Sequence, residues 1–224
     1  MHRANPPVQK KVESLREQVL RMGHLAEAIV DKAVRSVWKR DAELAGEVAA
    51  DDLPIDRLDI AIDKAVLELL ALQAPVAQDL RQVFAMKTAA TDLERVGDLA
   101  RNIAKSAIRL SERPPVSPPP PLEALADASR RVLKNALLSL ADYDAAKARA
   151  VLAADDQIDA DEDQAIRTAI AEIHNDPRVT EQGIDFILIA KNLERVGDHA
   201  TNIAEDVILV AESVNLKHAE KLVS

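Results

Sequence analysis

Residues 92–108, DLERVGDLARNIAKSAI, and residues 192–208, NLERVGDHATNIAEDVI, are two copies of one segment. They are identical at 11 of 17 positions at a constant offset of 100 residues. A second pair lies upstream in the same order, VAADDLPID at residues 48–56 and LAADDQID at residues 152–159. Self-similarity of this kind at a fixed spacing is typical of a repeated structural unit. The chain is therefore predicted to contain two copies of one unit.

Composition and periodicity predict that each unit is helical. Only 2% of the residues are aromatic and five are glycine, whereas alanine, leucine, isoleucine and valine dominate the apolar 48%. Apolar residues recur with a helical period in three segments of each half. These predicted helices cover residues 8–40, 42–72 and 76–110, and then 122–142, 145–174 and 180–214. The expected fold class is all-α, with two tandem three-helix bundles.

Prolines mark the expected boundaries. Residues 111–121, SERPPVSPPPP, form a predicted linker between a first domain at 1–110 and a second at 122–224, because proline lacks the amide hydrogen that a helix needs. Breaks are also expected at residues 73–75 and 175–177. Pro54 falls inside a predicted helix, where we expect a kink or a new N-terminus capped by Asp51 or Asp52.

Charge and residue inventory exclude several classes of protein. A formal net charge of −9 and the lack of any lysine or arginine run argue against nucleic-acid binding and favour cations or basic protein surfaces as partners. The chain has no cysteine, which excludes disulfides, thiolate metal sites and cysteine nucleophiles. No export signal and no apolar run of membrane-spanning length is present, so cytoplasmic residence is expected.

Two acidic stripes accompany the repeated segments. In each copy a Glu-x-x-x-Asp pair projects on the side of its helix opposite the apolar seam, and the face continues with Glu205 and Asp206 in the second copy. Like charges four residues apart cost about 0.2 to 0.5 kcal/mol, so solvent or a cation must offset them. Acids on the preceding helices can face these pairs. The candidate metal ligands are Glu94, Asp98, Glu194, Asp198, Asp52, Asp56, Asp155 and Asp159.

Plain solvation of surface carboxylates is the simpler explanation, but the basic neighbours differ between the copies. Arg101 can reach Asp98, whereas Thr201 stands at the equivalent position of the second copy. A site made of oxygen ligands alone suits Mg²⁺, Ca²⁺, Mn²⁺ or iron, including several ions bridged by shared carboxylates. Gly97 and Gly197 lie within these helices, and their cost there predicts close contact with a neighbouring helix.

The chain resembles the PhoU family over essentially its whole length. The matching motifs are QAPVAQDLR at residues 73–81, LERVGDLARNIA at 93–104 and AKNLERVGDHATNIAE at 190–205. Pro54 departs from the family pattern and could shift Asp52 and Asp56. The second copy also departs, because its DLR element is degenerate at residues 184–186.

The resemblance implies a cytoplasmic regulator that restrains phosphate-starvation signalling when phosphate is plentiful. Its implied partners are the ATPase subunit of a phosphate ABC transporter and a membrane sensor histidine kinase, and it implies a homodimer. Some members of the family bind multinuclear iron or zinc clusters on this surface, and other members have been seen without metal. Carried over by position, the motif acids are Glu94, Asp98, Glu194 and Asp198, and the acids that face them from the second helix of each half are Asp52, Asp56, Asp155 and Asp159. Peripheral association with the membrane is compatible with such partners.

Two other functions stay open from the sequence. A ferritin-like di-iron enzyme would also use carboxylates in a helical bundle, but none of the five histidines completes a Glu-x-x-His motif. A metal-free helical adaptor is the third hypothesis. No nucleophile elbow or glycine-rich phosphate loop is present, so a non-enzymatic role is expected. His199, whose counterpart is Leu99, is expected to be a hydrogen-bonding residue rather than a ligand.

Overall fold

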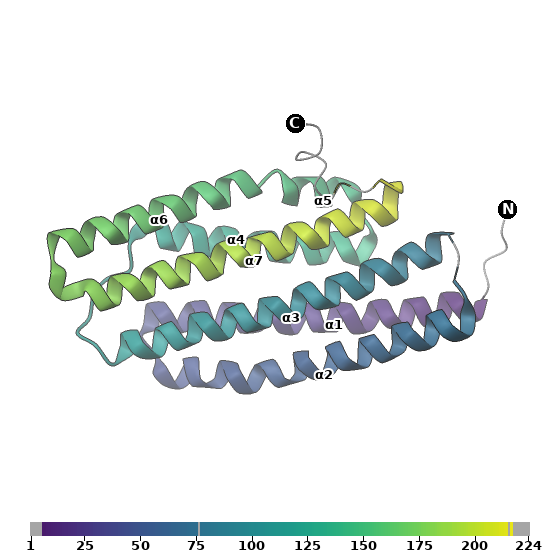
Figure 1. Ribbon diagram of the computed structural model, residues 1–224, viewed down its shortest axis with the longest axis horizontal. Helices are drawn as coiled ribbons and strands as arrows, with labels where there is room; N and C mark the ends of the chain where they lie inside the picture. Colours follow the sequence, from purple (N-terminus) through teal and green to yellow (C-terminus); the bar gives the residue numbers. More distant parts are fainter. Residues whose placement is uncertain (1–5, 76, 215, 217–224) are drawn as a thin grey trace.

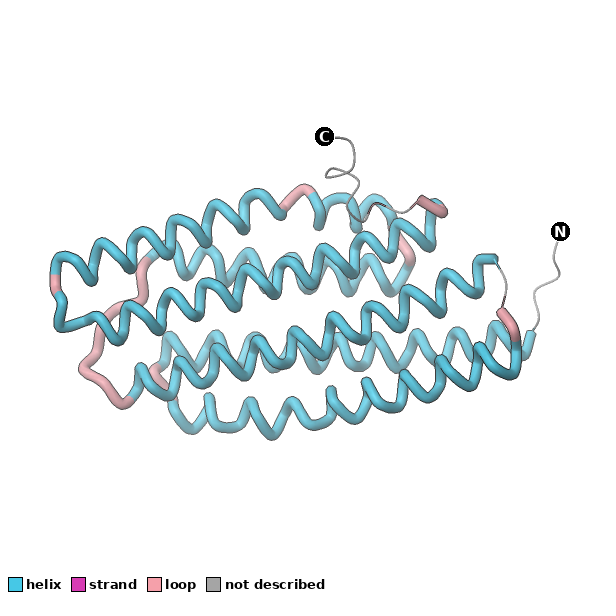
Figure 2. The backbone as a smooth tube through the Cα atoms, in the orientation of Figure 1, coloured by secondary structure: helices cyan, strands magenta, loops and turns pink. Residues whose placement is uncertain are grey.

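The computed structural model describes residues 6–75, 77–214 and 216 and confirms an all-α fold, with no strand among those residues (Figures 1 and 2). The first unit contains three long helices, and the second divides its middle helix in two. The helices are α1 (Pro6–Lys39), α2 (Ala42–Gln73), α3 (Ala77–Ser111), α4 (Pro120–Asp142), α5 (Ala145–Leu152), α6 (Asp155–Asn175), the 3₁₀ turn η1 (Pro177–Val179) and α7 (Thr180–Glu212).

The two units lie side by side through α3 and α7, which run antiparallel along the middle of the molecule (Figure 1). Helices α2 and α6 flank this pair at its two outer edges, while α1 and α4 lie behind it. One hydrophobic core cluster includes residues from both units. The apolar packing therefore does not stop at the linker, and the division into domains at residues 110 and 122 stays a prediction.

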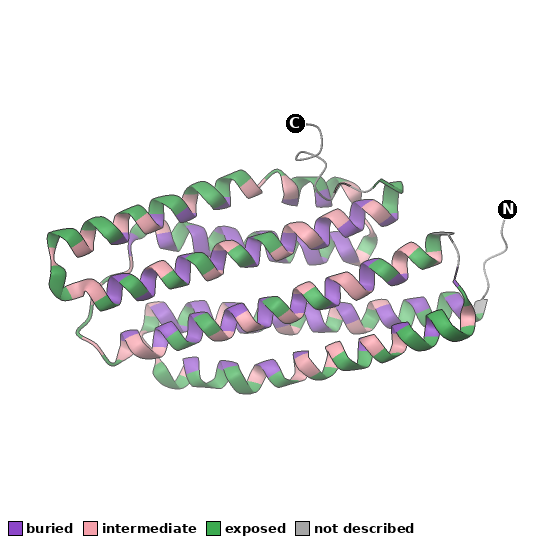
Figure 3. Cartoon of the chain, viewed as in Figure 1, coloured by how far each residue is buried: buried purple, intermediate pink, exposed green. Residues whose placement is uncertain are grey.

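The predicted apolar seam of α3 is the part of that helix that packs into the core. Its members are all fully buried: Leu93, Val96, Ala100, Ile103 and Ala107. Figure 3 shows the same alternation along the other helices, with buried residues on the inner side of each and exposed residues outside. Burial of such a stripe is what stabilises a helix of modest intrinsic propensity.

Helix α2 runs through Pro54 without a new N-terminus, so the predicted cap at Asp51 or Asp52 is wrong. The helix is capped instead by Asp41, whose carboxylate accepts a hydrogen bond from the Leu44 amide at 2.9 Å. Proline removes one backbone bond, which leaves the carbonyl four residues earlier, at Ala50, without its partner. Ala50 is exposed, so water can bind that carbonyl.

The break comes in the second unit, where a continuous helix over 145–174 was expected. Helix α5 ends at Leu152 and α6 begins at Asp155, which makes that prediction wrong. Asp155 and Asp156 occupy the first turn of α6, where carboxylates interact favourably with the helix dipole. No side-chain contact explains why the break falls here.

Buried residues of α2 match those of α5 and α6 at an offset of 103. Ala45, Val48 and Ile55 correspond in this way to Ala148, Val151 and Ile158, all buried. The N-cap residues of α2 and α5, Asp41 and Asp144, are also 103 residues apart. Hence Asp52 is equivalent to Asp155, and Asp56 to Asp159.

A buried aspartate on α7 binds the segment that joins the two units. Asp185 is 2% exposed and accepts hydrogen bonds from Arg109 Nε at 2.8 Å and Arg113 Nη1 at 2.5 Å. Arg40 donates to the carbonyl oxygens of Leu110 and Arg113 at 2.5 and 2.7 Å. The linker is thus held against both units by charged groups.

We expect Asp185→Ala to lower the free energy of unfolding by about 2 to 3 kcal/mol, because it leaves two arginines without the buried anion that they share. Chemical denaturation would measure the loss. Glu181→Ala is the matched control, since that carboxylate also pairs with Arg113, at 3.0 Å, but is 72% exposed. A control loss as large as that of Asp185→Ala would contradict the expectation.

None of the described helices combines the length and the apolarity needed to cross a lipid bilayer.

Candidate functional site

Carboxylates line two equivalent seams, one between α2 and α3 and the other between α6 and α7. The first acidic seam consists of Asp52, Asp56, Asp59, Asp63, Glu94 and Asp98. The second acidic seam consists of Asp155, Asp159, Glu162, Glu194 and Asp198. The two seams lie at opposite edges of the face formed by α2, α3, α7 and α6 (Figure 1). The predicted convergence of acids from consecutive helices therefore occurs in both units.

Glycine allows the helices of each seam to approach closely, as predicted. A Cβ atom at Gly97 would collide with Asp52 Oδ1, and it would also contact Ile55. A Cβ atom at Gly197 would lie 2.8 Å from Ile158 Cδ1. Real Cβ atoms essentially never come that close to another heavy atom, so a side chain at either position would force Asp52 or Ile158 to move.

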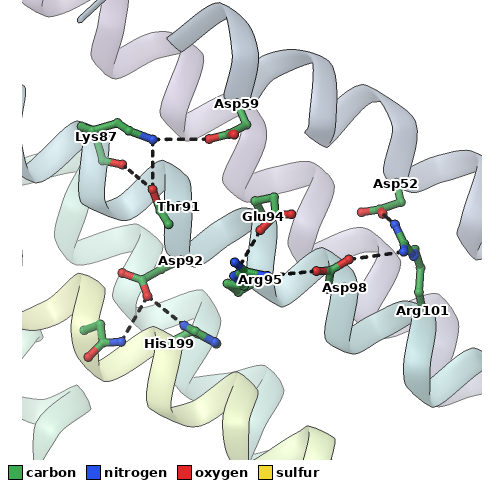
Figure 4. A network of polar contacts seen from close by, with 11 residues as sticks. Asp52, Asp59, Lys87, Thr91, Asp92, Glu94, Arg95, Asp98, Arg101 and His199 are labelled. Atoms are coloured by element: carbon green, nitrogen blue, oxygen red, sulfur yellow. Dashed lines mark hydrogen bonds and ion pairs between the residues drawn. The ribbon is translucent and has the colours of Figure 1, made fainter. Parts of the chain in front are cut away.

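Among the described residues, the first acidic seam contains three basic side chains, which pair with five of its six carboxylates (Figure 4). Arg101 Nη1 lies 2.7 Å from Asp52 Oδ2, and Arg101 Nη2 lies 3.4 Å from Asp98 Oδ1. Arg95 lies 3.5 Å from both Glu94 and Asp98. For Glu94 and Asp98 the prediction of solvent or an external cation is therefore wrong, because arginines of the same helix pair with both.

Two further acids of α2 are paired with one lysine at the other end of the first acidic seam. Lys87 Nζ lies 2.5 Å from Asp63 and 3.8 Å from Asp59. The sequence predicted that Asp52 lies on the outer surface. In the structure it is buried, with only 1% of its surface exposed. Burial raises its pKa, and the hydrogen bond from Arg101 opposes that shift.

The second acidic seam has fewer internal cations. Lys191 Nζ pairs with Glu162 at 2.5 Å, but within the part of the chain that is described neither Glu194 nor Asp198 has an ion pair. Burial, with the nearby charges of Asp198 and Glu162, raises the pKa of Glu194 to about 7. The pKa of Asp198 is raised as well, by burial and then by Asp159. The second seam thus holds carboxylates whose charge is poorly compensated.

The eight predicted ligands do not form a preorganised metal site. Over residues 6–75, 77–214 and 216 no group of three or more acids or histidines is arranged to hold a metal ion. In the first unit Arg101 stands between Asp52 and Asp98, so that set does not fit a metal. In the second unit Lys191 pairs with Glu162, and the carboxylates of Asp159, Glu194 and Asp198 would have to rotate to share an ion.

Polar residues between α3 and α7 were not foreseen as a group. Asp92 accepts hydrogen bonds from His199 at 2.8 Å and Asn202 at 3.1 Å, in accord with the expected role of His199. Asp206, expected on the outer acidic face, is fully buried and accepts a hydrogen bond from Thr88. Its place beside Ile203 and Val210 on a helical projection, three residues from one and four from the other, was the available signal. These contacts join the two units.

A family comparison matches both units of this architecture. The PhoU domain family matches residues 19–107 and 122–207. The chain belongs to the PhoU family. It is 37% identical to the phosphate-specific transport system accessory protein PhoU homolog of Xylella fastidiosa strain 9a5c, over 86% of this chain and 81% of that protein. The corresponding protein of Aquifex aeolicus is 34% identical, over 93% and 95% of the two chains.

Solved PhoU structures share the fold. The crystal structure of PhoU from Pseudomonas aeruginosa superimposes with a TM-score of 0.88 at 32% identity, covering 92% of this chain and 99% of that one. The PhoU phosphate transport system regulatory protein of Streptococcus pneumoniae gives a TM-score of 0.86 at 26% identity, covering 93% and 99%. The LERVGD segments that form the α3 and α7 sides of the seams thus belong to a PhoU architecture.

Proposed function

We propose that this protein is an accessory and regulatory protein of phosphate uptake. The observation that carries the proposal is the match of both repeats to the PhoU family. Relatives that this chain covers over more than four fifths of their length are named as accessory proteins of a phosphate-specific transport system. The Streptococcus pneumoniae PhoU protein is likewise named as a regulatory protein of the phosphate transport system. These relatives are named for regulation rather than for catalysis.

In the proposed role the protein acts in the cytoplasm and represses the phosphate-starvation response when phosphate is abundant. It does so by coupling the ATPase subunit of a phosphate ABC transporter to a sensor histidine kinase, either alone or as a homodimer. The net charge of −9 supports a basic docking surface on a partner. The undercompensated carboxylates of the second acidic seam support the same conclusion.

The metal component of the proposal is confined to the second unit. Asp155, Asp159, Glu194 and Asp198 would hold a hard or borderline cation, which would supply positive charge to the outer face. A ferritin-like enzyme would instead direct its carboxylates into the bundle core. Glu194 and Asp198 lie in a partly exposed seam, and we therefore favour a regulatory cation over a catalytic one.

Deleting the gene should derepress phosphate-regulated genes in phosphate-rich medium, and the wild-type gene should restore repression. Transcript levels of the phosphate-uptake operon provide the measurement. A strain carrying Glu194→Gln with Asp198→Asn should restore repression only in part if the second seam takes part. Full repression in the deletion strain would contradict the regulatory role.

A further inference from the structure

The two acidic seams differ at a pair of equivalent positions next to the Glu-x-x-x-Asp motif. Arg101 and Thr201 occupy the same place on α3 and α7, one turn after the Glu-x-x-x-Asp pair. The Arg101 guanidinium bridges the two helices of the first seam, because it reaches both Asp52 on α2 and Asp98 on α3 (Figure 4). It therefore occupies the space between carboxylates that any bound cation would need.

Asp52, which pairs with this guanidinium, uses only one of its two carboxylate oxygens. Asp52 Oδ2 accepts from Arg101, whereas Asp52 Oδ1 is buried without a hydrogen-bond partner. A carboxylate that is 1% exposed needs a positive partner, since an unpaired buried charge is costly. Arg101 is the only group within 4 Å that supplies one to Asp52 among the described residues.

Thr201 cannot act in this way in the second unit. Its hydroxyl donates to the backbone carbonyl of Asp198 at 2.7 Å, so it is engaged with its own helix and carries no charge. Lys191, which pairs with Glu162 in that seam, lies more than two turns before Thr201. Position 191 is Thr91 in the first unit, so the cations are placed differently in the two seams.

We infer that Arg101 is the resident cation between Asp52 and Asp98 of the first acidic seam, and that the residue at this position decides which unit can take up a hard divalent cation. Arginine closes the first unit to an ion, and threonine leaves the second open. This inference rests on the proposed function for the second seam, but its central claim concerns the first. It makes the two halves of the repeat unequal in function.

The decisive experiment exchanges the two residues and counts bound Mn²⁺. Chelator-treated protein is equilibrated with Mn²⁺, and free ion is measured by electron paramagnetic resonance. Arg101→Thr should bind at least one more Mn²⁺ per chain than the wild type. Adding Glu94→Gln and Asp98→Asn to that variant should remove the gained site. Thr201→Arg should lose the ion that the wild type binds.

Stability provides a second measurement that needs no count of sites. Arg101→Thr should unfold at a lower temperature than the wild type, and Mn²⁺ should restore several degrees of that loss because it binds only the folded state. Arg101→Gln is the alternative variant should the threonine form fail to fold. Circular dichroism establishes folding before any ion is counted.

An unchanged Mn²⁺ stoichiometry in folded Arg101→Thr and Arg101→Gln would overturn the inference. A loss of Mn²⁺ on placing Glu94→Gln and Asp98→Asn in the wild-type background would overturn it too, because the first seam would then be open already. A wild type that binds no Mn²⁺ while Arg101→Thr gains a site would support Arg101 as the resident cation. That result would count only against the metal component of the proposed function.

Discussion

Gly97→Val should lower the free energy of unfolding by about 2 to 4 kcal/mol, the range for forcing extra atoms into a tightly packed contact. Any Cβ atom at this position collides with Asp52 Oδ1, and the larger valine also meets Ile55. Asp52 cannot move away freely, because it is buried and bound to Arg101. The substitution would therefore push α2 away from α3. Urea denaturation would measure the effect.

Gly46→Val is the control for Gly97→Val, since Gly46 also lies within a long helix but nothing is within 4 Å of its Cβ position. Valine and glycine differ by only a few tenths of a kcal/mol in helix propensity, so this variant should stay within about 0.5 kcal/mol of the wild type. Equal losses in the two variants would show that helix propensity, and not the contact with α2, accounts for the effect.

Glu194→Gln should stabilise the protein at pH 8 by up to about 3 kcal/mol while changing little at pH 4.5. Burial beside Asp198 and Glu162 raises the pKa of Glu194 from 4.5 to about 7. Each unit of such a shift corresponds to about 1.4 kcal/mol, and solvent reduces the effect for a partly exposed group. Glutamine removes the charge but keeps the shape of the side chain.

The direction of the pH dependence follows from the two protonation states. Between pH 4.5 and 7 the unfolded chain releases the Glu194 proton while the folded chain keeps it, so stability falls as pH rises through this window. Above pH 7 the folded form is charged too, and the full cost is present. The stability difference between Glu194→Gln and the wild type should therefore grow over this window and then level off.

Thermal or chemical unfolding at several pH values, without added metal, would measure this difference. Glu94→Gln is the matched variant, because Glu94 occupies the equivalent position but lies 3.5 Å from Arg95. Its gain at pH 8 should be smaller. A difference between Glu194→Gln and the wild type that is the same at pH 5 and pH 8 would contradict the expected cause.

Local signals were sufficient for most of the helices. The period of apolar residues predicted five of the six expected long helices to within about two residues at each described end. A helix that buries one side has apolar residues at a regular spacing, which is visible in the sequence. Val76, at the start of the third expected helix, lies outside the described residues. The exceptions concern Pro54 and the break at Ala153 and Ala154. At Pro54 water can bind the exposed Ala50 carbonyl that the proline leaves without its partner, and at the break the first turn of α6 gains the favourable charge of Asp155 and Asp156.

The environment of the acidic residues could be predicted only in part from the spacing of apolar residues. A helical projection separates an apolar face from a polar one, but it does not tell a carboxylate in solvent from one beneath an arginine. Asp52 and Asp98 were correctly placed on facing helices, yet their pairing with Arg101 depends on how far α2 lies from α3. That spacing depends in turn on Gly97.

Residue order alone was enough to establish the duplication, the helical class, the family and the identity of the motif acids. Each of these depends on residue type and spacing along one chain. Helix packing, by contrast, is what pairs Asp52 with Arg101 and Asp63 with Lys87 and leaves Glu194 and Asp198 without an ion pair among the described residues. The physical reason is that charge compensation acts over a few ångströms between different helices, so it depends on their packing and not on sequence order.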